Sequence, residues 1–321
     1  MLRQPLPEGL GDRFSVSEAL GAGASHSRLL NDDLEKPFWG VRRRGDGLDI
    51  DARVDRRGSP RGALELDHLR RALDYVPRMD EHQFFCRVTA AVILGIPLPV
   101  SLAQTDHIDV AVLAPRRLPR SKGVRGHQMV ARLTTVERDP SLHVALTDPA
   151  TTWASLGAVI RHPDDLIAAG DAVVRDWRSE PLASIADLQA AIDRGRRVGI
   201  GALREAIPHI RTRSASRPES RLRRVIVAAG LPEPELNHDV VEDGEHLACS
   251  DLVYPELRIA IEYEGEHHLT DSEQWAYDIA RYDRLRDAGW HVIRVTKSDL
   301  FQHPERVIRR VRAAISARSS S

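Results

Sequence analysis

The 321-residue chain has few cysteines and no apolar run long enough to cross a membrane. Its two cysteines, Cys86 and Cys249, match neither a disulfide framework nor a zinc motif in their spacing. A membrane span needs roughly 18 consecutive apolar residues, and no segment reaches that length. No apolar signal segment follows the first methionine. These absences exclude a disulfide scaffold, and we expect a soluble, cytoplasmic protein with no membrane partner.

An excess of charge of one sign is also missing. The chain has 46 Lys and Arg residues against 47 Asp and Glu residues, a net charge of −1. This balance excludes a uniformly basic nucleic-acid coat, but it leaves room for local basic patches. Hydrophobic residues make up 42% of the chain, which is typical of a globular protein, and the length predicts two or three domains.

Residues 1–45 predict a small DNA-binding module of the winged helix-turn-helix type. Apolar spacing predicts helices over residues 14–20 and 25–34, with a glycine turn between them. A short extended segment and the basic run 42–44 follow. This order of elements is typical of a winged helix-turn-helix, although a helical hairpin with a solvated arginine run explains the same pattern.

Residues 63–205 predict a mixed α/β domain in which we find no catalytic group of residues. Helical spacing covers residues 81–94, alternating apolar residues at 107–113 predict a strand, and the glycines of 123–127 predict a turn. Three carboxylates of this region are interpreted as helix caps rather than ligands: Asp164, Asp165 and Asp171.

Residues 216–316 predict a third domain with the element order α-β-β-β-α-β-α. Pro218 favours the start of the first helix. Strands are expected over 236–241, 247–253 and 258–264, and an amphipathic helix over 273–288 precedes a fourth strand. The chain as a whole is therefore expected to be a multidomain α/β protein.

Three carboxylates of this last domain are expected to converge. Alternation along strand 258–264 places Glu262 and Glu264 on one face, and a tight turn brings Asp251 of the preceding strand opposite them. Clustered carboxylates repel one another unless a divalent cation lies among them, and oxygen ligands suit Mg²⁺ or Mn²⁺. The alternative is that the two glutamates mark the solvent face of the sheet.

The spacing of these residues resembles a known nuclease family. After Asp251 and ten further residues, the chain continues with Glu262-Tyr-Glu264-Gly265, a histidine, Asp278, Arg281 and the pair Gly289-Trp290. This set, within about residues 216–300, resembles the very-short-patch-repair (Vsr-like) endonucleases of the PD-(D/E)xK superfamily. The resemblance implies a restriction-endonuclease-like αβββαβ core.

The resemblance also implies roles for individual residues. Glu219 corresponds to the acid of the first helix, and Asp251 with Glu262 and Glu264 corresponds to the metal-binding acids. His268 corresponds to the family's histidine, or failing that His267. The usual superfamily lysine is replaced, because Glu264 stands at that position and no lysine occurs within 216–296.

The front half has a looser resemblance to abortive-infection type IV antitoxin-like proteins. It rests on residues 14–44, the GVRGH segment at 123–127 and the segment from Leu146 to Asp171. That resemblance implies a winged helix joined to a mixed α/β domain, and a possible toxin or operon partner.

We therefore expect a Mg²⁺- or Mn²⁺-dependent DNA endonuclease of defence or repair type. His268 is expected to act as general base or acid near neutral pH. Cations of the first helix are candidates for the DNA backbone, although solvated helix faces explain them equally well. The candidate DNA contacts are Arg217, Arg221, Arg224 and Arg281.

The alternative function is a non-enzymatic DNA-binding regulator with a decayed nuclease fold. The oligomeric state is not predicted.

Overall fold

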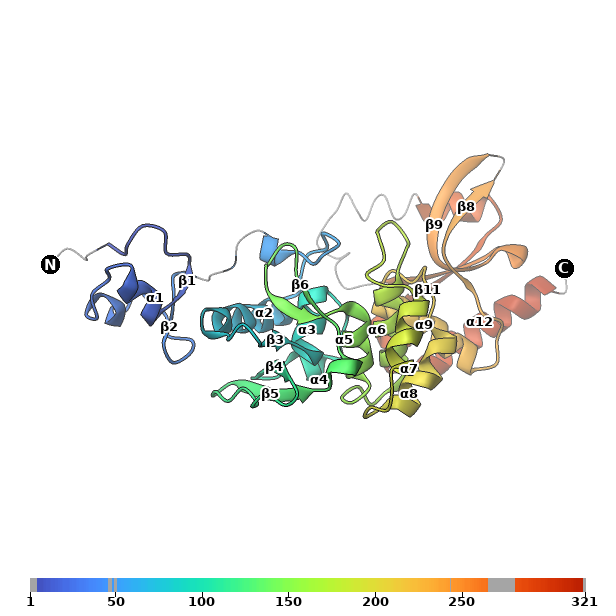
Figure 1. Ribbon diagram of the computed structural model, residues 1–321. Helices are drawn as coiled ribbons and strands as arrows, with labels where there is room; N and C mark the ends of the chain where they lie inside the picture. The colour runs from blue at the N-terminus through green and yellow to red at the C-terminus, as the bar shows by residue number, and fades with distance from the viewer. Residues whose placement is uncertain (1–4, 46–47, 49–50, 243, 265–280, 320–321) are drawn as a thin grey trace. The chain divides into compact units, whose positions relative to one another are not determined.

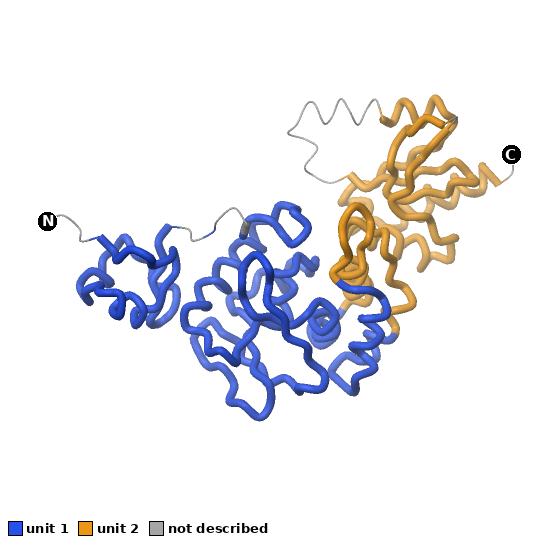
Figure 2. Tube along the Cα trace, turned by 45° about the horizontal axis from the view of Figure 1, so that its top comes forward, with its two compact units in different colours: residues 1–161, 183–204 blue, residues 162–182, 205–321 orange. Residues whose placement is uncertain are grey.

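The structure, a computed structural model, describes residues 5–45, 48, 51–242, 244–264 and 281–319 (Figure 1). The chain divides into two compact units (Figure 2). Unit 1 comprises residues 1–161 and 183–204, and unit 2 comprises residues 162–182 and 205–321. This division differs from the expected boundaries at 63–205 and 216–316, because residues 162–182 belong to unit 2.

The first part of unit 1 is a two-stranded sheet with one α-helix. Strand β1 (Arg13–Ser15) pairs antiparallel with β2 (Val41–Arg43), and α1 (Val16–Gly21) begins at a capping box formed by Ser15 and Glu18. The second helix expected over residues 25–34 is wrong. Only the 3₁₀ turn η1 (Arg28–Leu30) forms there, because Asn31 adopts an extended conformation and ends it.

The rest of unit 1 is built on a five-stranded sheet with the strand order β5-β4-β3-β7-β6. The strands are β3 (Phe84–Phe85), β4 (Ile108–Leu113), β5 (Val124–Met129), β6 (Val136–Arg138) and β7 (Ala145–Thr147). The helices are α2 (Ala63–Tyr75), α3 (Arg87–Leu94), α4 (Val100–Ala103), α5 (Pro149–Leu156) and α7 (Ile185–Asp193). Helix α8 (Ile200–Ala206) spans the boundary of the two units.

Strand β4 confirms the expected strand at 107–113, but two neighbouring expectations are wrong. The segment 123–127 is not a turn, because it lies mostly in β5, which pairs parallel with β4. There Gly126 is needed, since any Cβ would collide with the Pro119 carbonyl oxygen. The helix expected over 81–94 begins only at Arg87, because Phe84 and Phe85 form the short central strand β3.

From residue 217 onwards, the described elements of unit 2 follow the predicted order, with one short helix added after the last strand, and most of the helix expected over 273–288 lies outside the described residues. Helix α9 (Arg217–Ala228) precedes the strands β8 (Glu235–Glu242), β9 (Glu245–Tyr254) and β10 (Ile259–Glu264). Residues 281–287 are helical, and β11 (His291–Thr296), α11 (Lys297–Phe301) and α12 (Pro304–Ser319) follow. In the sheet order β11-β10-β9-β8, the first pair is parallel and the other two are antiparallel. Helix α6 (Pro163–Val174) also belongs to this unit.

The two faces of the unit 2 sheet bury different residues. Ile259 and Ile261 of β10 lie in one apolar cluster with Leu222 of α9 and Val307 of α12. Ala260 lies in a second cluster with Leu285 and Trp290. This confirms the predicted alternation along β10, which leaves Glu262 and Glu264 on the Ala260 face. No helix within the described ranges is both long enough and apolar enough to cross a bilayer.

Candidate active site

Asp251 and Glu262 face each other where strands β9 and β10 separate. The last ladder pair is Leu252 with Ile261, so the next pair along the two strands is Asp251 with Glu262. In place of a further backbone bond, Asp251 Oδ2 accepts a hydrogen bond from the Tyr263 amide at 2.8 Å. The Asp251 side chain thus occupies the opening between the strands, on the side of the sheet that carries Glu262.

Glu219 of α9 is another buried carboxylate of unit 2. Helix α9 starts at the N-cap Ser216, whose hydroxyl accepts from the Glu219 amide. The Glu219 side chain is buried, and its Oε2 accepts from the Ala215 amide at 2.9 Å and from Asn237 Nδ2 at 2.7 Å. A carboxylate fixed by two donors keeps one orientation, so Glu219 is held rigidly at the first turn of α9.

The charges of two glutamates act on the ionisation of Asp251. Burial raises the pKa of Asp251 well above its usual value, and the charges of Glu262 and Glu219 raise it further. Burial also raises the pKa of Glu262, opposed by the Arg281 guanidinium, and it raises the pKa of Glu219, opposed chiefly by the Asn237 amide. The sequence predicts that Asp251 converges with Glu262 and Glu264, and the strand register brings Asp251 opposite Glu262.

Glu264 has a different environment from Glu262. Glu262 is 2% exposed, and its Oε2 lies 3.3 Å from Nη1 of Arg281. Its Oε1 is buried and has no hydrogen-bond partner within the part of the chain that the structure describes. Glu264 is half-buried and pairs with Arg294 of the neighbouring strand β11. The two glutamates share a face of β10, but each has its own cation.

Several expected site residues lie outside the described ranges. His267, His268 and Asp278 fall within 265–280, as does Gly265. Arg281 is described, and it contacts Glu262 and the Cys249 carbonyl oxygen at 3.3 Å. Among the described residues, no three His, Cys, Asp or Glu side chains form a group that could hold a metal ion.

The arginines of α9 contact helix α6 of the same unit. Arg217 pairs with Asp165 at 2.6 Å, and Arg221 and Arg224 both pair with Asp164 at 2.6 and 3.1 Å. Three of the four arginines expected to contact DNA thus have a carboxylate partner within unit 2, two of them sharing Asp164, so the geometry gives them a structural role.

The same contacts correct the expected role of the α6 acids. The N-cap of α6 is His162, and not Asp164 or Asp165. Asp171 pairs with Arg223 at 3.1 Å, and both side chains are 1% exposed. No local sequence pattern could reveal these contacts, because the partners lie more than 50 positions apart.

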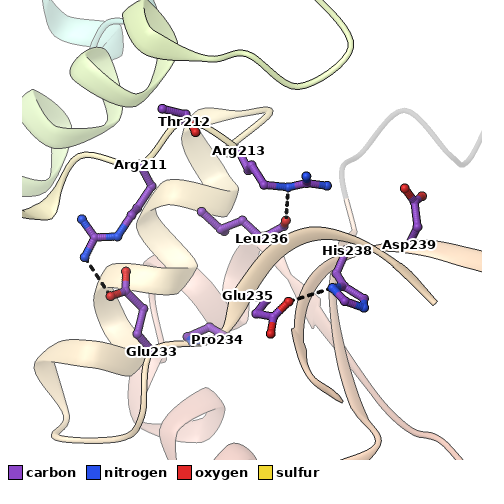
Figure 3. A pocket seen from close by; sticks show the side chains of 9 residues that line it. All are labelled: Arg211, Thr212, Arg213, Glu233, Pro234, Glu235, Leu236, His238 and Asp239. Carbon is purple, nitrogen blue, oxygen red and sulfur yellow. Dashed lines mark hydrogen bonds and ion pairs between the residues drawn. The ribbon is translucent and has the colours of Figure 1, made fainter. Parts of the chain in front are cut away.

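A cavity of about 510 Å³ lies along the start of β8, at the open edge of the unit 2 sheet (Figure 3). Its charged side chains are mostly paired with neighbours. Arg211 contacts Glu233 at 2.8 Å, and Arg213 donates to the Leu236 carbonyl oxygen at 3.1 Å. Arg213 also donates to the backbone of Asn237, the residue that holds Glu219. Arg213 therefore helps to hold Asn237, and through it Glu219, in place.

Comparison with known proteins places the chain in a family. A family model described as REase_MTES_1575 matches residues 246–315. Two Mycobacterium tuberculosis proteins are 32% identical to the chain over 250 residues: Uncharacterized protein MT2308 of strain CDC 1551 / Oshkosh and Uncharacterized protein Rv2248 of strain ATCC 25618 / H37Rv. Each alignment covers 78% of this chain and 87% of the relative. The chain belongs to their family. No solved structure shows significant similarity to it.

The match to this family model identifies a restriction-endonuclease-like domain in the C-terminal region. It contains most of β9, together with β10, β11 and most of α12, and so it includes Asp251, Glu262 and Arg281. Glu219 precedes the matched segment, and its charge raises the pKa of Asp251.

Proposed function

We propose that the protein is a metal-dependent DNA endonuclease whose site lies in unit 2. The observation that carries the proposal is the opposition of Asp251 and Glu262 at the opening between β9 and β10. A restriction-endonuclease-like domain around this pair supports a nuclease. DNA as the substrate and a defence or repair role follow from the resemblance to Vsr-like endonucleases.

The donor set suits a divalent cation. Asp251 and Glu262 present carboxylate oxygens only, which favours Mg²⁺ or Mn²⁺ over Zn²⁺. A cation would offset the repulsion that raises the pKa of Asp251, and it would give a partner to the buried Glu262 Oε1. We propose Asp251 and Glu262 as its ligands. When bound, such an ion polarises phosphoryl oxygens and lowers the pKa of a coordinated water.

Other residues of the chain would position the attacking water and the phosphate next to Asp251 and Glu262. Glu219, fixed by Asn237 and the Ala215 amide, would orient the attacking water from α9. Arg281 would keep Glu262 ionised and lie near the negative charge that develops on the phosphate. His268 remains our candidate for proton transfer.

The front of the chain is proposed to recognise DNA. Residues 13–43 form β1, α1 and β2 in the order of a small winged module, with a single α-helix. We propose that this module contacts DNA, and that the remainder of unit 1 is related to antitoxin-like proteins. A toxin or operon partner and a cytoplasmic location belong to the same proposal.

A DNA-binding regulator without nuclease activity is the second candidate. Two observations favour it: Glu264 pairs with Arg294, and no lysine lies within 216–296. A decayed site would keep the fold and lose catalysis. DNA binding alone would then explain the front module.

Cleavage of supercoiled plasmid distinguishes the two candidates. The full chain is incubated with plasmid and Mg²⁺ or Mn²⁺, beside an EDTA control, Asp251→Asn and the matched variant Asp239→Asn. Asp239 is an exposed acid of the adjacent strand β8. Nicking that EDTA and Asp251→Asn abolish, and Asp239→Asn retains, supports the endonuclease. Equal DNA binding by all three proteins without any nicking favours the regulator.

A further inference from the structure

Unit 1 contains a small cationic cavity that the proposed nuclease site does not use. It has a volume of about 140 Å³ and lies among the start of α3, strand β5, helix α5 and the turn after α7. Its lining includes Arg87, His127 and Arg197. None of the described residues that line it carries a carboxylate. Two arginines and no lining carboxylate give the cavity a positive lining, which favours an anion.

Arg87 is held in an unusual backbone conformation at this cavity. It is the first residue of α3, and its φ angle is +50°, in the left-handed region that disfavours side chains other than Asn, Asp and Gly. Its guanidinium makes no hydrogen bond or ion pair with any described residue. The N-cap Cys86 gives the helix no side-chain cap. A strained residue that carries an unused cation is typical of a binding site.

Neighbours hold both His127 and Arg197 in place, and the Arg197 guanidinium keeps donors for a ligand. His127 Nε2 lies 2.7 Å from Oδ1 of Asp109, a carboxylate that is 2% exposed, and this contact sets the orientation of the ring. Arg197 donates to the carbonyl oxygens of Leu133 and Ala191. Its Nε is buried and finds no partner among the described residues. Carbonyl contacts hold the Arg197 guanidinium in place without neutralising its charge.

We propose that this cavity binds a terminal phosphate group, and that the guanidiniums of Arg87 and Arg197, beside His127, are its ligands. Pockets for whole drug-sized molecules begin at roughly 300 Å³, so a cavity of about 140 Å³ suits a single tetrahedral anion rather than a complete nucleotide. Arginine forks match phosphate oxygens in geometry. The phosphate comes either from a nucleic-acid end or from the free ion. The site is independent of the proposed nuclease activity.

The test is equilibrium binding in EDTA, which keeps cleavage out of the measurement. Fluorescence anisotropy compares two 3′-labelled single-stranded oligonucleotides of the same sequence, one with a 5′-phosphate and one with a 5′-hydroxyl. A parallel melting experiment adds inorganic phosphate. We expect the full chain to bind the 5′-phosphorylated strand at least tenfold more tightly. If inorganic phosphate raises the melting temperature and the two strands bind equally, the ligand is the free ion.

Arg87→Asn separates binding from folding. Asparagine tolerates a positive φ angle, so this variant should melt at the same temperature as the parent or higher, and it should lose the preference for phosphate. Arg178→Asn is the matched control, because Arg178 is an arginine with a φ angle of +54° in unit 2. It should keep the preference within about twofold. An Arg87→Asn variant that binds both probes as the parent does, or a parent that responds to neither, overturns the proposal.

Discussion

Asp251 accepts the Tyr263 amide hydrogen bond at 2.8 Å, at the point where β9 and β10 stop pairing. A side chain therefore replaces the backbone carbonyl that a continued ladder would supply. The consequence is an opening in the sheet with Asp251 on one strand and Glu262 on the other.

Glu262→Gln should lose metal-dependent nicking by at least about a hundredfold, whereas Glu264→Gln should stay within about tenfold of the parent. The two substitutions are identical in size and fall on the same face of β10. They differ because Glu262 faces Asp251, whereas Glu264 pairs with Arg294. Initial nicking rates of supercoiled plasmid measure the difference. Equal losses would show that Glu264 belongs to the site.

Arg281→Met should destabilise the metal-free protein by about 2 kcal/mol or more, because it leaves the buried Glu262 carboxylate without its cation. Mg²⁺ should recover part of that loss if it binds at Glu262. Thermal melting with and without Mg²⁺ gives both values. Arg286→Met is the control on the same helical segment, since Arg286 is 64% exposed and its pair with Asp283 contributes at most about 1 kcal/mol. A loss that Mg²⁺ leaves unchanged would argue against Glu262 as a ligand.

Arg223→Met should reduce the free energy of unfolding by about 3–5 kcal/mol, since Asp171 then remains buried without its partner. The double variant Arg223→Met, Asp171→Leu should recover much of this loss, because no buried charge is left unpaired and Glu233, the second partner of Arg223, keeps its pair with Arg211. Arg217→Met should cost far less, as Arg217 and Asp165 are partly exposed. Urea denaturation of the four proteins tests the series. Equal costs for Arg223→Met and Arg217→Met would contradict it.

The stability of unit 1 should fall as the pH drops from about 6.5 to about 4. Burial lowers the pKa of His68 to about 4, so in this range the unfolded chain binds a proton that the folded chain does not. The stabilisation from neutral His68 is present above pH 6.5 and decreases by up to about 3 kcal/mol towards pH 4.

His68→Gln provides the comparison for this pH effect. Glutamine does not titrate and retains a group that can bond to Thr89, which contacts His68 Nε2 at 2.9 Å. The difference in melting temperature between the parent and the variant should therefore shrink or reverse as the pH falls to 4.5. Parallel pH profiles for the two proteins would refute a lowered pKa at His68.

The sequence alone determined two features of unit 2: the alternation of faces along β10 and the start of α9. Strict alternation in β10 placed Ile259 and Ile261 on one face and Glu262 on the other, as the two apolar clusters confirm. Ser216 and Pro218 marked the start of α9. These signals are local, because side-chain alternation along a strand and capping at a helix start depend only on residues close in sequence.

Tertiary structure decided the rest, because the deciding partners are distant in sequence. Phe84 and Phe85 form a strand because they lie between β4 and β7, and helical spacing alone could not reveal that pairing. Asp164 became a partner of Arg221 instead of a cap only when α6 packed on α9. Ion pairing and strand pairing depend on which surfaces meet, and only the folded chain fixes those surfaces.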